Sequence, residues 1–151
     1  MTPTLAGRIQ TRLALLATVG LAWTLLVTPL LPRGVAFGSD SELGELYEAT
    51  ITALAVVAIL GAVVWEPIYH GLQQLRWEKD WPISIGLASG LLEGAVAFAA
   101  MDEMVMDGSS VVLPSTFWWH FVTTWIVVWL FANGPMRVVL LRWRYRGGRV
   151  R

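Results

Sequence analysis

Two titratable side chains lie within long apolar stretches of the sequence, and any chemistry of this protein is expected to begin with them. Glu93 is the one charged residue within 83–101, and His120 lies in a stretch from 111 to 136 without Asp, Glu, Lys or Arg. At 1.5 Å per helical residue, each lies roughly 15 Å from the end of a predicted helix, so the two are predicted to face each other at mid-membrane. An ionisable residue at that depth is a candidate functional site by default.

Two interpretations of the Glu93–His120 pair are open. A functional pair would relay protons or cations, since both side chains exchange protons. A structural pair would only fix the register of two helices by a hydrogen bond. The chain shows no obvious inverted repeats or paired broken helices, which weighs against a transporter. The polar residues expected around the pair are Ser89 on the helix of Glu93, and Thr116, Thr123 and Thr124 on that of His120.

The composition places the chain in a membrane. Of its 151 residues, 56% are apolar and 15% are charged, and the mean hydropathy is +0.59. Soluble domains have about 25% charged residues. With 11 basic and 11 acidic residues there is no basic excess of the kind that nucleic-acid binding needs. The absence of cysteine excludes disulfides and thiolate metal sites.

Four apolar stretches are long enough to cross a bilayer as helices, which needs roughly 20 residues each. The predicted spans are 13–32, 45–65, 83–101 and 113–134, in a single membrane domain covering 1–151 with a basic tail at 136–151. Pro67 is predicted to end or kink the second helix, before a short interfacial helix at 67–77, and residues 133–135 to stop or kink the fourth. The predicted fold class is an all-α integral membrane protein, a four-helix transmembrane bundle.

The basic residues predict the orientation. Four spans place both termini on one side, and ten of the 11 basic residues fall there, including Arg8 and Arg12 in the N-terminal segment. Because basic residues stay on the cytoplasmic side, the N- and C-termini are predicted to be cytoplasmic in a multi-pass protein of the cell inner membrane.

Small residues predict where the helices approach closely. Gly86, Gly90 and Gly94 recur at four-residue spacing, which permits close packing of helix backbones in lipid. Ala58 and Ala62 on the second helix are the expected facing surface. The glycine stripe either forms an oligomer interface or packs against the chain's own helices.

Aromatic and basic residues predict contacts with lipid or with a partner protein. Tryptophans are typical of membrane boundaries, and clustered arginines bind anionic headgroups or an acidic partner. The residues predicted to make such contacts are Trp65, Trp77, Trp81, Trp125, Trp129, Arg142, Arg144 and Arg146.

No motif predicts catalysis. The sequence lacks a two-histidine zinc motif, a glycine-rich phosphate loop and a nucleophile elbow, so no metal, no cofactor and no enzymatic activity are expected. The predicted function is that of a structural or accessory subunit in a homo-oligomer or a larger membrane complex. The alternative is a proton- or cation-conducting channel or transporter that uses Glu93 and His120.

Overall fold

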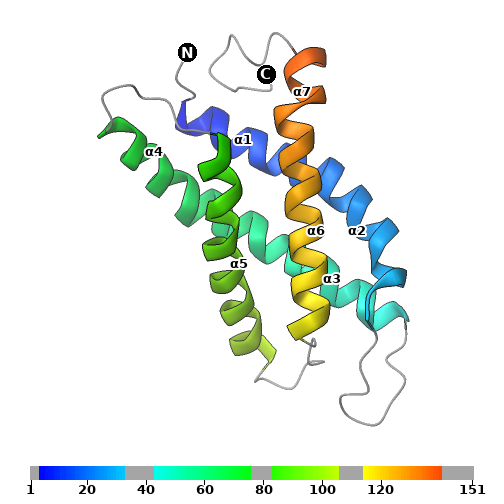
Figure 1. Ribbon diagram of the computed structural model, residues 1–151. Helices are drawn as coiled ribbons and strands as arrows, with labels where there is room; N and C mark the ends of the chain where they lie inside the picture. Colours follow the sequence, from blue (N-terminus) through cyan, green and yellow to red (C-terminus); the bar gives the residue numbers. More distant parts are fainter. Residues whose placement is uncertain (1–3, 33–42, 76–82, 106–113, 141–151) are drawn as a thin grey trace.

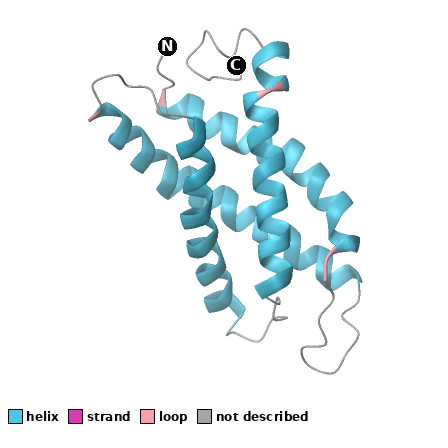
Figure 2. Cartoon of the chain, in the orientation of Figure 1, coloured by secondary structure: helices cyan, strands magenta, loops and turns pink. Residues whose placement is uncertain are grey.

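The computed structural model describes residues 4–32, 43–75, 83–105 and 114–140, and the regular elements within these ranges are all helices (Figure 2). Four continuous helical rods are long and apolar enough to cross a membrane: Leu5–Leu30, Leu43–Gln74, Ser84–Asp102 and Pro114–Val139. This confirms the prediction of an all-helical chain with four apolar helices, as a multi-pass membrane protein requires.

The first rod begins earlier than the sequence indicated. It consists of α1 (Leu5–Leu15), a π-helical turn η1 (Leu16–Gly20), α2 (Leu21–Val27) and a 3₁₀ turn η2 (Thr28–Leu30). Thr4 caps α1, because its Oγ1 accepts a hydrogen bond from the backbone N–H of Gly7 at 3.2 Å. The helix therefore begins at Leu5 rather than near residue 13, and Arg8 and Arg12 lie inside it.

The second rod passes through Pro67 without ending. It consists of α3 (Leu43–Leu60), a second π-helical turn η3 (Gly61–Trp65) and α4 (Glu66–Gln74). Pro67 lies in the first turn of α4, directly after the π-turn. Proline lacks an N–H and crowds the preceding turn, and the wider i→i+5 pattern of a π-turn accommodates this. The segment predicted as a separate interfacial helix is thus the last part of the second rod.

The remaining two rods begin close to residues 83 and 113, where the predicted third and fourth spans begin. α5 covers Ile83–Val105, α6 covers Pro114–Asn133 and the short α7 covers Pro135–Val139. Gly134 interrupts the fourth rod between α6 and α7, and its N–H still bonds to the carbonyl of Leu130 at 2.8 Å. The break predicted at residues 133–135 is confirmed as an interruption within a continuing rod.

The rods form an antiparallel bundle (Figure 1). α1 begins, α4 ends, α5 begins and α7 ends at the same end of the bundle, which is the arrangement that four successive spans produce. α5 packs on α3 and on α6, and α6 also packs on the π-turn η1. The core between them contains Leu54 and Val57 from α3, Ala97 from α5, and Phe117 and Phe121 from α6.

Two of the three glycines of the stripe on α5 face aromatic side chains of α6. A Cβ atom at Gly90 would overlap the indole of Trp125, and one at Gly94 would lie 2.5 Å from Cε1 of Phe121. A Cβ at Gly86 would meet nothing within 4 Å. Two of the three glycines thus pack within the chain, and they meet α6 instead of the expected Ala58 and Ala62, which are half-buried on the second rod.

We expect Gly90→Ala to destabilise the protein by about 1–3 kcal/mol, since the added methyl group overpacks a tight helix contact. The indole of Trp125 would have to move away from the carbonyl of Leu87, to which its Nε1 donates at 3.3 Å. The matched variant Gly86→Ala, one turn earlier on α5, should be neutral or slightly stabilising because alanine favours a helix. Denaturant unfolding in detergent, followed by circular dichroism, compares the two variants. Equal effects would contradict the assigned packing.

Candidate functional site

Glu93 is buried and pairs with an arginine of the first rod. Its side chain is 2% exposed. The guanidinium of Arg12 donates to both carboxylate oxygens, Nη1 to Oε2 at 2.5 Å and Nη2 to Oε1 at 3.0 Å. Such a two-pronged contact is the strongest geometry that an arginine and a carboxylate form. Glu93 therefore joins α5 to α1.

The same arginine holds a second buried carboxylate. Arg12 Nε donates to Glu66 Oε1 at 2.8 Å, and Arg8 Nε donates to the other oxygen, Oε2, at 2.6 Å. Arg8 Nη1 also donates to Oε1 of Gln73 at 3.1 Å. We call these five residues, Arg8, Arg12, Glu66, Gln73 and Glu93, the ion network. Its two positive and two negative side chains balance, and it connects α1, α4 and α5.

The guanidinium of Arg12 occupies space that is open because residue 61 is a glycine. Gly61, the first residue of the π-turn η3, lies so close that a Cβ there would overlap the guanidinium. On the α6 side, the Cζ of Arg12 lies 5.7 Å from the ring centroid of Trp125, a cation–π distance. With Glu93 on α5, each of the other three rods thus contacts this one side chain of the first rod.

His120 has a different partner from Glu93. It is 2% exposed, and its Nε2 lies 2.9 Å from the hydroxyl oxygen of Thr24 on α2. One turn further along the first rod, the hydroxyl oxygen of Thr28 lies 2.9 Å from that of Thr50 on α3. This contact links the first rod to α3. Hydrogen bonds of this kind hold helices together in an apolar surrounding.

The expected contact between Glu93 and His120 is therefore replaced by two separate contacts. Arg12 of α1 reaches the carboxylate of Glu93, and Thr24 of α2 reaches the imidazole of His120. The sequence prediction began the first helix at residue 13 and so left Arg12 outside it. No counter-charge for Glu93 was therefore expected within the predicted spans. The carboxylate takes a full positive charge as its partner, because a charged hydrogen bond is stronger than a neutral one.

The other predicted polar residues mostly bond to backbone carbonyls. Thr116 donates to the carbonyl of Pro32 at 2.7 Å, which ties the start of α6 to the end of the first rod. Thr123 donates to the carbonyl of Trp119 at 2.8 Å, and Ser89 to that of Gly86 at 3.1 Å. Thr124 is buried, and its hydroxyl has no partner among the described residues.

The predicted tryptophan and arginine contacts are only partly within the described residues. Trp125 and Trp129 are half-buried on α6, and Trp65 is half-buried and stacks on Tyr69 with ring centroids 5.8 Å apart. Five further residues with predicted contacts lie outside the described ranges: Trp77, Trp81, Arg142, Arg144 and Arg146.

Comparison with known protein families, with curated proteins and with solved structures gives no match. What the site does must therefore follow from its own geometry. In the ranges that the structure describes, no three His, Cys, Asp or Glu side chains lie close enough together to hold a metal ion. In the ion network, the N–H groups of both arginines donate to carboxylate or amide oxygens on other helices. This arrangement is suited to joining helices.

Proposed function

We propose that the protein is a small multi-pass membrane protein without catalysis, which acts as a structural or accessory subunit of a homo-oligomer or of a larger membrane complex. The observation that carries this proposal is the convergence of the other three rods on Arg12 of the first rod. Glu66, Glu93, Gly61 and Trp125 contact it from three different rods. A charge held in this way fixes the relative positions of the helices and supports a rigid scaffold.

The alternative is a proton- or cation-conducting channel or transporter based on Glu93 and His120. The ion network supports it less well. Arg12 bonds to both carboxylate oxygens of Glu93, so the ion pair would have to open before Glu93 could bind a transported proton or cation. His120 bonds to Thr24, so a relay would need a further step between the two residues.

The proposal includes a place in the cell membrane with cytoplasmic N- and C-termini. Arg8 and Arg12 take part in the ion network, so they no longer count as free surface charge. The eight other basic residues on the predicted cytoplasmic side still outweigh Arg33 on the opposite side. This asymmetry supports the orientation by the positive-inside rule.

The fourth rod offers the surface for association with another subunit. In the fourth rod, Pro114–Val139, only 11% of the 18-residue apolar stretch is buried within the chain. The corresponding share is 28% or more in each of the other three rods. Trp119, near the start of α6, is 61% exposed. Exposed aromatic side chains are typical of subunit interfaces and of lipid contacts alike.

The mass of the purified protein in mild detergent tests the proposal. We expect an oligomer of the chain or a defined complex, measured by native mass spectrometry after mild solubilisation. A strict monomer that binds no other protein would contradict it.

Proton flux in proteoliposomes tests the alternative. We expect Glu93→Gln and the wild type to give the same flux, at the level of empty vesicles, with the fold checked by circular dichroism. Wild-type flux above that level, abolished by Glu93→Gln, would instead establish conduction.

A further inference from the structure

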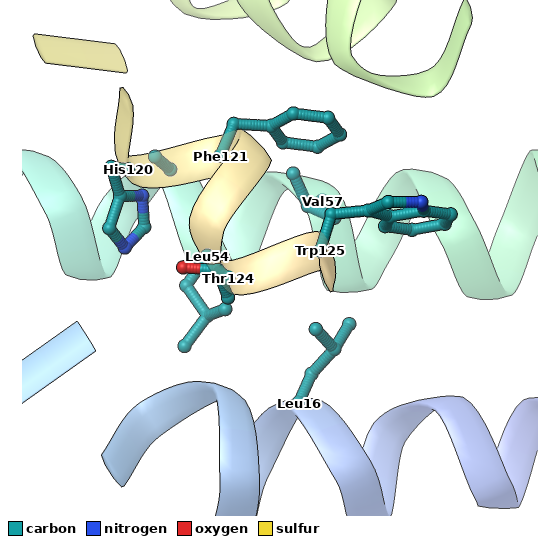
Figure 3. A pocket seen from close by; sticks show the side chains of 8 residues that line it. Leu16, Leu54, Val57, His120, Phe121, Thr124 and Trp125 are labelled. Atoms are coloured by element: carbon teal, nitrogen blue, oxygen red, sulfur yellow. The ribbon is translucent and has the colours of Figure 1, made fainter. Parts of the chain in front are cut away.

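A small, partly open cavity lies between η1, α3 and α6 (Figure 3). Its volume is about 10 Å³, and its apolar lining includes Leu16, Leu54 and Phe121. His120 and Thr124, one turn apart on α6, add polar groups to this lining. A cavity of about 10–15 Å³ is the smallest that holds one water molecule.

The hydroxyl of Thr124 lacks the hydrogen bond that four other threonines of these helices form. Thr18, Thr28, Thr50 and Thr123 each donate to the carbonyl four residues earlier. Thr124 is 4% exposed, and its buried hydroxyl has no such bond and no other partner among the described residues. A local carbonyl bond is open to any helical threonine. A buried hydroxyl that lines the cavity without forming this bond is therefore available to a partner inside the cavity.

Leaving that hydroxyl unpaired is costly. A buried polar group without a hydrogen bond loses the stabilisation that water gives it elsewhere. Thr124 lies in the middle of an apolar rod, away from both of its ends. Bulk water does not reach such a position in a membrane, so a partner must be built into the core.

We propose that this cavity holds a single water molecule, hydrogen-bonded to the hydroxyl of Thr124 with the imidazole of His120 as the neighbouring polar group. Figure 3 shows both side chains projecting from α6 into the same part of the lining. The water lies next to the Thr24–His120 contact, which joins α6 to α2. The volume of about 10 Å³ limits the site to one molecule.

Density from a high-resolution crystal or cryo-electron microscopy structure tests the site directly. The wild type should show a water peak within hydrogen-bond distance of Thr124 Oγ1, and Thr124→Val, which keeps the shape but lacks the hydroxyl, should lose it. An empty cavity in the wild type would overturn the proposal.

The melting temperature in detergent gives an independent answer, because the two possibilities predict shifts of opposite sign. With a bound water, Thr124→Val removes a satisfied hydrogen bond, and Tm should fall by about 2–4 °C. With an empty cavity, the variant removes an unpaired buried hydroxyl, so Tm should stay equal or rise, which would overturn the proposal. The matched control is Thr123→Val, whose hydroxyl bonds within its own helix at a half-buried position and should shift Tm less.

Discussion

Replacing Arg12 with methionine is expected to lower the free energy of unfolding by about 3–5 kcal/mol. The change leaves the carboxylates of Glu66 and Glu93 in the core without the guanidinium that now bonds to both. Their side chains are 8% and 2% exposed, so water does not replace the lost charge. Removing one partner of a buried ion pair is costly for this reason, whatever the net contribution of the intact pair.

Matched variants show whether the unpaired charge is the cause. Arg8→Met should cost less, because Glu66 keeps Arg12 and the side chain of Arg8 is 22% exposed. Combining Arg12→Met with Glu93→Gln should recover most of the lost stability, since Glu66 keeps Arg8 and no buried carboxylate is then left unpaired. Unfolding in detergent or bicelles gives the three values. Equal losses for Arg8→Met and Arg12→Met, or no recovery in the double variant Arg12→Met with Glu93→Gln, would contradict this account.

Much of the architecture was predictable from apolar length and from proline. The four rods, the start of α6 at Pro114 and the interruption at Gly134 all follow from local features of the sequence. These features act within one helix, through hydropathy and through the missing N–H of proline. Pro67 was harder to interpret, because whether a proline ends a helix depends on the turn before it. Here that turn is π-helical.

The partners of Glu93 were not predictable from the same evidence. Its depth indicated a buried acid, which the structure confirms. The counter-charge comes from Arg12, 81 residues away, and Arg12 also pairs with Glu66, 54 residues away. A search for charge-free stretches places the start of a helix after its last arginine. It therefore excludes an arginine that is neutralised by another helix.

One signal in the sequence does point to the ion network. Arg8 and Arg12 are four residues apart, and Glu66 and Gln73 are seven apart, so each pair lies on one face of a helix. Two basic residues on one face and an acid with an amide on another are complementary. That complementarity marks a candidate helix contact, although spacing alone does not say that the two faces meet.

Gly61→Ala is the second large effect that we expect, at about 2–4 kcal/mol of destabilisation. The new methyl group would occupy the position of the Arg12 guanidinium and force the side chain away from its carboxylates. Gly71→Ala is the matched control on the same rod, because a Cβ there meets nothing within 4 Å. It should be neutral or slightly stabilising in the same unfolding measurement.

A double-mutant cycle decides whether Gly61 acts through Arg12 or through the backbone of the π-turn. In the Arg12→Met background the guanidinium is absent, so Gly61→Ala should lower the free energy of unfolding much less than it does in the wild type. Such a difference is a coupling between the two sites, because the effects of independent sites add. If its cost were unchanged in that background, the glycine would be needed for the π-turn itself. A large coupling would establish that η3 presents a glycine at this point because the buried arginine fills the space that a side chain would take.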